Sequence, residues 1–283
     1  MNAGPALALA LALLAAPAGA VQLGDDWGRT VAVSAGARRI VSLAPHATEL
    51  LFAAGLGAHV VAVDASSDFP PEVRALPAIN AMPAPDPERL MALRPDLVVA
   101  WGAGVSREQV ARLERLGLAV FVSDPRSLEA IAATLERFAR ASADPRRGAE
   151  AAAAFRARVA RARARYGSRA PVDVFVQAWA RPLIALSDRD MVGDALAACG
   201  GRNVFRGLGS AAAPVGAEAV LRAAPRLIVA TGESADREPW ESLGVLEPRG
   251  PIAFARVGSE IERPSLRAID ALEQLCAAID AVR

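Results

Sequence analysis

The stretch PERLMALRPDLVVAW, Pro87 to Trp101, returns in the second half of the chain as AEAVLRAAPRLIVAT, Ala217 to Thr231. In both copies a helical pattern stops at a proline and is followed by a buried apolar run, which is one half of an α/β unit. A glutamate holds the same place in each copy, Glu88 in the first and Glu218 in the second. The repeat therefore predicts two similar lobes with one matched acidic residue on each.

The pattern around the repeat predicts alternating strands and helices. Strands are expected at 39–43, 59–63, 119–122 and 172–177, and helices at 47–54, 106–116, 128–141, 191–199 and from Pro264 to the end. Such alternation favours mostly parallel sheets covered by helices. Before them, residues 25–33 alternate around a glycine and predict a short hairpin.

A long helix is expected between the two copies of the repeat. Asp144 and Pro145 form a cap and a first helical position, and an Ala/Arg-rich run continues to about Tyr166. Phe155, Val159 and Ala162 form one apolar stripe. We expect an α/β protein of two Rossmann-like lobes (21–143 and 169–283), joined by one long rigid α-helix (144–168), with a ligand cleft between the lobes.

The N-terminus carries an export signal pattern. An apolar run too short to span a bilayer is followed by Ala18-Gly19-Ala20, a small-residue cleavage signature. We expect residues 1–20 to be a signal peptide cleaved after Ala20 and the protein to be periplasmic; a retained anchor is the alternative. In an oxidising compartment Cys199 and Cys276 fit a disulfide, with two buried free thiols as the alternative.

The net charge, the motifs and the number of histidines limit the classes of function that this chain could have. The net charge is +1, which implies neither a nucleic acid nor an acidic surface as partner. The chain shows no nucleophile elbow, no HEXXH motif and no phosphate loop of standard spacing, so no catalytic residue is assigned. Two histidines are a thin ligand set for a zinc or manganese receptor, and no metal site is assigned.

Several segments resemble the periplasmic substrate-binding proteins of ABC importers that have a helical backbone (class III), and most closely their cobalamin-binding members. The segments are RIVSLAPHATELLFAAG (39–55), SDFPPE (67–72), RLMALRPDLVVAW (89–101), CGGRNVF (199–205) and EQLC (273–276). They are spread over nearly the whole chain after residue 20.

The resemblance implies a non-catalytic monomer that captures cobalamin or a related corrinoid as transported ligand. It also implies a disulfide between Cys199 and Cys276, and docking on a two-fold symmetric ABC permease through Glu88 and Glu218. Taken alone, each glutamate is ordinary compensation of a helix dipole. A haem or iron-siderophore receptor of the same fold is the alternative, with His46 as an axial ligand for haem.

The expected ligand-binding residues come from strand ends, loops and the resemblance. They are His46, Ser66, Phe69, Met82, Trp101, Trp179, Ser259 and Glu260. For His46 a polar turn residue is the alternative, and for the aromatic side chains it is packing in the core or at the hinge. The resemblance places aromatic residues at Ser66, Met82, Ala178 and Ala212, where this chain has none, so its ligand is less firmly specified than its fold.

Overall fold

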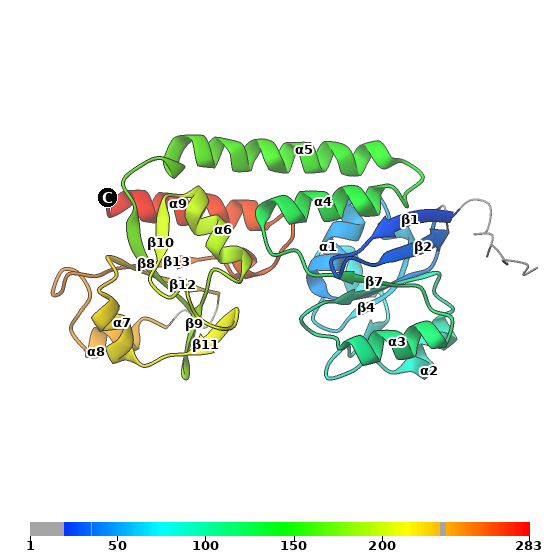
Figure 1. Ribbon diagram of the computed structural model, residues 1–283, viewed down its shortest axis with the longest axis horizontal. Coiled ribbons are helices and arrows are strands. Elements are labelled where there is room, and N and C mark those ends of the chain that lie inside the picture. Colours follow the sequence, from blue (N-terminus) through cyan, green and yellow to red (C-terminus); the bar gives the residue numbers. More distant parts are fainter. Residues whose placement is uncertain (1–19, 35, 233–235) are drawn as a thin grey trace, which may run out of the picture.

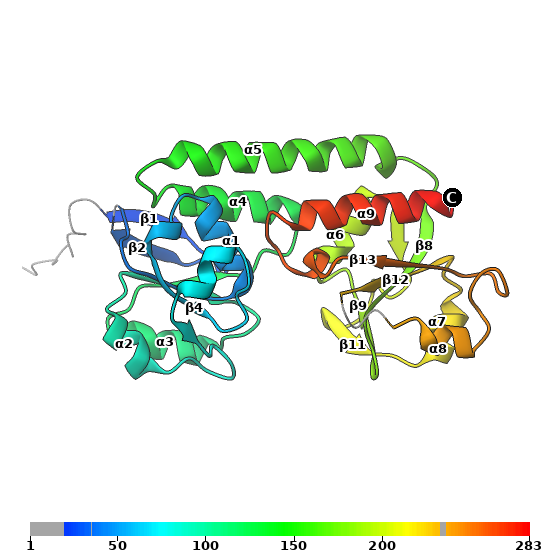
Figure 2. The same ribbon diagram turned by 180° about the vertical axis from the view of Figure 1, so that it is seen from behind.

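The computed structural model describes residues 20–34, 36–232 and 236–283. Two α/β lobes lie side by side, and one long helix runs along both of them (Figures 1 and 2). The two-lobed α/β architecture predicted from the repeat is therefore confirmed.

The N-terminal lobe is built on a five-stranded parallel sheet with strand order β5-β4-β3-β6-β7. Its strands are β3 (Ile40–Leu43), β4 (Val60–Asp64), β5 (Ala78–Ile79), β6 (Leu97–Trp101) and β7 (Val120–Ser123). Its helices are α1 (Pro45–Ala53), α2 (Pro87–Leu93), α3 (Arg107–Arg115) and α4 (Leu128–Ala139), with 3-10 turns at Gly57–His59 and Pro71–Ala75. The central strands are apolar on both faces because helices cover both sides of the sheet.

The N-terminal hairpin pairs β1 (Ala20–Gly24) with β2 (Thr30–Ser34) in antiparallel fashion. The prediction that the hairpin lies within 25–33 was wrong in its first strand, because residues 25–29 form the turn. The Asp25 carboxylate accepts the backbone N–H groups of Trp27 at 3.1 Å and of Arg29 at 2.8 Å, which stabilises that turn. The expected signal peptide lies outside the described residues, except Ala20.

The C-terminal lobe has a mixed sheet of order β11-β9-β8-β12-β13, in which β10 also pairs with β8. Its strands are β8 (Val172–Ala180), β9 (Leu183–Leu186), β10 (Gly201–Asn203), β11 (Ala212–Pro214), β12 (Leu227–Thr231) and β13 (Ala253–Val257). Its helices are α6 (Met191–Ala198), α7 (Ala217–Ala223), α8 (Glu238–Ser242) and α9 (Ala268–Ala281), with a 3-10 turn at Ser259–Glu262. The pairs β8–β9 and β9–β11 are antiparallel, and the other pairs are parallel.

The long helix α5 (Pro145–Ala162) continues as a π-helical turn, Arg163–Gly167, within the stretch expected to connect the lobes. It packs against α4 of the N-terminal lobe and α9 of the C-terminal lobe (Figure 1). Arg156 of α5 forms an ion pair with Glu129 of α4 at 2.6 Å, and Arg158 forms one with Asp270 of α9 at 2.6 Å. Within the described residues, no helix is long and apolar enough to cross a bilayer.

A disulfide joins Cys199, at the end of α6, to Cys276 within α9. The expected pairing is confirmed, and the free-thiol alternative is excluded. Helix α9 begins at Ala268 and not at Pro264 as expected. The reason is a turn in which the Ser265 N–H donates to the Arg263 carbonyl.

The sequence repeat is also a structural repeat. Helices α2 and α7 each end on a left-handed residue, Arg94 with φ 47° and Ala224 with φ 48°. Each then feeds a central strand of its sheet, β6 or β12. The C-terminal ends of the two helices therefore have the same local geometry, and in each copy the glutamate lies in the first helical turn.

Candidate ligand cleft between the lobes

A cavity of about 690 Å³ lies between the two lobes. Residues of the N-terminal lobe that line it include Leu43, His46, Asp64, Ser66, Met82, Trp101 and Asp124. Residues of the C-terminal lobe that line it include Leu186, Arg189, Asp190, Met191, Ser259, Glu262 and Arg263. Its volume falls within the range of small-molecule sites, about 300–1,000 Å³.

The cavity is positioned by the parallel strands of the N-terminal lobe. Lining residues lie at or just after the carboxyl ends of β3, β4, β5, β6 and β7. Ligands of open α/β sheets bind at these ends, because the connections to the following helices diverge there and expose polar groups.

His46 lies in the first turn of α1, whose Pro45 occupies the first helical position. Its ring Nε2 is 3.0 Å from the hydroxyl of Ser123, at the end of β7. Burial lowers the pKa of His46 to about 4, and the positive charge of Arg263 acts in the same direction. The imidazole is therefore neutral at neutral pH.

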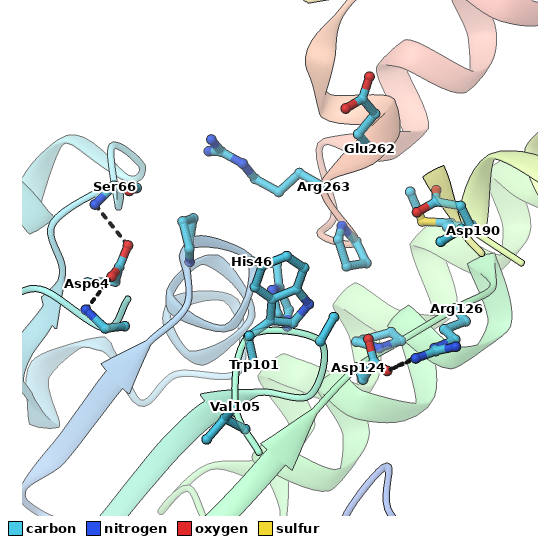
Figure 3. A pocket seen from close by; sticks show the side chains of 18 of the residues that line it. His46, Asp64, Ser66, Trp101, Val105, Asp124, Arg126, Asp190, Glu262 and Arg263 are labelled. Atoms are coloured by element: carbon cyan, nitrogen blue, oxygen red, sulfur yellow. Dashed lines mark hydrogen bonds and ion pairs between the residues drawn. The ribbon is translucent and has the colours of Figure 1, made fainter. Parts of the chain in front are cut away.

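Two carboxylates of the C-terminal lobe line the cavity close to the start of α6 and to the turn after β13 (Figure 3). Asp190 caps α6 and accepts the Val192 N–H at 3.1 Å, and Glu262 accepts a hydrogen bond from the Thr231 hydroxyl. Burial raises the pKa of both groups, and the charge of Asp190 contributes to the rise at Glu262. Neither forms an ion pair with any described residue.

The lining arginines differ in their partners. Arg126 forms an ion pair with Asp124 at 2.6 Å. Arg263 extends toward the N-terminal lobe (Figure 3) and forms an ion pair with Asp68 at 2.5 Å. Arg189 donates to the Leu208 carbonyl at 3.2 Å and has no carboxylate partner within the described part of the chain. Most of the positive charge in the cavity is therefore already neutralised.

The apolar part of the N-terminal wall is formed around Trp101, at the end of β6. The Trp101 ring packs so closely on Gly104 that a Cβ there would lie 2.8 Å from a ring carbon and 3.3 Å from the sulfur of Met82. Trp101 remains 43% exposed and Met82 58% exposed. Both therefore offer apolar surface to a ligand.

The structure brings five of the eight expected ligand-binding residues to the cavity wall: His46, Ser66, Met82, Trp101 and Ser259. Phe69, Trp179 and Glu260 lie outside the lining. Trp179 lies inside β8, not after it as expected, and its indole N–H donates to the Arg181 carbonyl at 2.9 Å. Phe69 lies under the guanidinium of Arg267, 4.5 Å from the ring centroid.

Four lining carboxylates were missing from the expected set: Asp64, Asp124, Asp190 and Glu262. Asp64 ends β4, and Asp124 follows Ser123 at the end of β7, so the acidic residue at the end of each of these parallel strands was a usable signal for both. Asp190 and Glu262 lie beside a helix start and in a turn, and only the tertiary arrangement brings them together.

The matched glutamates are both exposed, in the first turns of α2 and α7. These helices belong to different lobes, but both lie on the side of the molecule opposite α5 (Figures 1 and 2).

Comparison with known proteins agrees with this architecture. A family model described as periplasmic binding protein matches residues 40–241. The vitamin B12-binding protein of Vibrio cholerae is 34% identical over 243 residues, 85% of this chain and 88% of that protein. The vitamin B12-binding protein of Vibrio campbellii is 33% identical over 251 residues, 87% of this chain and 91% of that protein.

Solved structures give the same result. The periplasmic vitamin B12-binding protein of Vibrio cholerae superposes with a TM-score of 0.79 at 32% identity, covering 87% of this chain and 98% of that one. A periplasmic haem-binding protein of Roseiflexus sp. RS-1 superposes with a TM-score of 0.73 at 27% identity, covering 88% and 100% of the two chains. With its two lobes, its inter-lobe cavity and these similarities, the chain belongs to the periplasmic binding protein family.

Proposed function

We propose that this protein captures cobalamin or a related corrinoid in the periplasm and delivers it to the permease of an ABC importer. It acts by binding and not by catalysis, as a monomer, after export and cleavage of its signal peptide behind Ala20. The relatives named above that are 33–34% identical are vitamin B12-binding proteins, which supports the corrinoid as ligand.

The main support for a corrinoid as the ligand is the distribution of charge in the cavity. The lining carboxylates Asp190 and Glu262 form no ion pair with a described residue, although the charge of Arg126 acts on Asp190, whereas Arg126 and Arg263 are paired with Asp124 and Asp68. A corrinoid presents a rim of amide groups that can donate to such carboxylates. Haem presents two propionate carboxylates, and Arg189 is the one lining arginine without a carboxylate partner among the described residues to receive them.

Two further features suit a corrinoid. Trp101 and Met82 offer exposed apolar surface to a flat macrocycle. Arg189 is the lining arginine without a carboxylate partner among the described residues, and it can meet the phosphate of the nucleotide loop of cobalamin. His46, Ser66 and Ser259 line the cavity and supply polar groups to a ligand.

Calorimetric titration of the exported protein tests the ligand. Cyanocobalamin, dicyanocobinamide and hemin are titrated separately, and an absorption spectrum is recorded after each. We expect both corrinoids to bind and hemin not to bind. A shifted Soret band with hemin, together with no heat from either corrinoid, would assign the protein to the haem-binding alternative.

Two tryptophan variants test the cavity as the binding site. Trp101→Ala should weaken cyanocobalamin binding by about tenfold or more, because an aromatic face on a flat ligand buries a large apolar area. Trp179→Ala is the matched control, since Trp179 is 51% exposed and lies outside the lining. If Trp179→Ala weakened cyanocobalamin binding more than Trp101→Ala did, the binding surface would lie near Trp179 and not in the cavity.

A further inference from the structure

A cluster of ionic side chains connects the two lobes beside the cavity, and Arg263 is its one member that also lines the cavity. Glu49 of α1 and Asp68 of the loop after β4 belong to the N-terminal lobe. Arg263 and Arg267, between the last 3-10 turn and α9, belong to the C-terminal lobe. We propose that Glu49 is a positioning residue that holds Arg263 at the edge of the cavity and thereby fixes the spacing of the lobes.

The carboxylate of Glu49 forms a bidentate ion pair with the guanidinium of Arg267. Its Oε1 accepts from Arg267 Nη2 at 2.7 Å, and its Oε2 accepts from Arg267 Nε at 3.1 Å. Its Oε1 also accepts from Arg263 Nη1 at 3.1 Å. The Glu49 side chain is only 4% exposed. A buried carboxylate facing a planar guanidinium fork tolerates little displacement, so this contact fixes a distance between the lobes.

The other contacts of the cluster lead from Glu49 to the cavity. Arg263 Nη1 also donates to Asp68 at 2.5 Å, and Arg263 itself lines the cavity. Arg267 lies over the ring of Phe69, and its Nη1 approaches Glu260 at 3.4 Å. Phe69 and Glu260, expected at the ligand, are thus part of this inter-lobe contact.

The position of Glu49 on α1 links the cluster to the ligand site. His46 faces the cavity from the first turn of α1, and Glu49 follows one turn later on the same side of the helix. A change in the spacing of the lobes at Glu49 therefore changes the width of the cavity between His46 and Arg263. Glu49 acts on the ligand only through Arg263, because it does not line the cavity itself.

Distances between the lobes test this role without any ligand. Spin labels at Arg115→Cys of α3 and Arg222→Cys of α7, both exposed, report the spacing of the lobes by pulsed electron resonance. Glu49→Gln should broaden the distance distribution and shift it, and Glu49→Asp should give an intermediate result. Arg267→Gln removes the same contact from the other lobe and serves if Glu49→Gln does not fold.

Cyanocobalamin binding provides the second readout, and only this part rests on the proposed function. If only about a tenth of the molecules keep the lobe spacing that permits binding, the apparent affinity for cyanocobalamin falls about tenfold. Glu273→Gln is the matched control, since it removes an exposed ion pair of α9 with Arg158, away from the cavity. It should leave both the distances and the affinity unchanged.

The outcomes separate the two proposals. A folded Glu49→Gln or Arg267→Gln variant with wild-type distances overturns the role of Glu49, whatever the ligand is. Altered distances in a protein that never binds cyanocobalamin leave the positioning role standing and overturn the proposed ligand.

Discussion

At the scale of single residues, His46 shows how the end of a strand positions a side chain in the cavity. The turn after β3 places it at the start of α1, and Ser123 from another strand fixes its ring. Burial keeps the imidazole neutral, so it can exchange hydrogen bonds with a neutral ligand without bringing a charge into the cavity.

The lowered pKa of His46 predicts a pH-dependent stability. Between its ordinary pKa of 6.5 and about 4, the unfolded chain binds a proton at His46 that the folded protein does not. The neutral His46 therefore makes its full contribution to folding stability above pH 6.5, and this contribution is lost as the pH falls toward 4. It amounts to about 3 kcal/mol in the free energy of unfolding.

Urea unfolding of the ligand-free protein at pH 7 and pH 4 checks this prediction against His46→Gln. Both proteins lose stability as their carboxylates titrate, but the wild type should lose about 3 kcal/mol more than the variant. Equal losses in the two proteins would mean that His46 takes up its proton at the same pH whether the chain is folded or not.

At the scale of elements, helices begin at specific capping residues and are then held in place by tertiary contacts. Ser106 and Gln109 form a capping box at the start of α3, and Asp144 caps α5. Helix α6 is capped by Asp190, and the disulfide ties its end to α9 across a sequence separation of 77 residues. Since α6 carries Met191 of the cavity wall, this bridge also supports the site.

Removing the disulfide with a Cys199→Ala, Cys276→Ala double variant should lower the free energy of unfolding by about 4 kcal/mol. The reason is that the bridge restricts the unfolded chain over a long loop. Denaturant unfolding of the wild type with and without reductant gives an independent measure of the same quantity. A loss below about 1 kcal/mol by both routes would contradict the prediction.

At the scale of the whole molecule, the two lobes present equivalent surfaces on one side. Glu88 and Glu218 occupy the same turn of equivalent helices, and both helices lie opposite α5 (Figure 1). A two-fold symmetric permease would offer the same pocket twice, so this arrangement suits docking through both glutamates. The lobe boundaries at 143 and 169, and the rigidity of the connecting helix, remain predictions.

Reversing both charges, Glu88→Arg with Glu218→Arg, should abolish ligand uptake in cells and leave cyanocobalamin binding unchanged. The control is Glu150→Arg with Glu273→Arg, which makes the same change in net charge on α5 and α9. Uptake measured with radiolabelled cobalamin should persist in the control. Normal uptake by the Glu88, Glu218 variant would exclude these residues as docking contacts.

The sequence by itself determined most elements of the N-terminal lobe, the repeat and the cysteine pairing, but it predicted neither β9, β11 and β13 nor α8 of the C-terminal lobe. The predicted features depend on local signals: proline ends the helices at Arg94 and Ala224, apolar runs become buried strands, and a resemblance identified Cys199 with Cys276. It also located His46 and Trp101, because the ends of parallel strands meet at one edge of a sheet.

Only the tertiary structure decided which side chains meet across the lobes. Asp190 and Glu262 come together from a helix start and a distant turn, and Glu49 meets Arg267 from the other lobe. The converse holds for Phe69 and Trp179: both were expected to contact the ligand, but the tertiary structure places them outside the cavity wall. Local patterns set where a strand ends, but the spacing and orientation of two separately folded sheets decide which of those ends share a cavity.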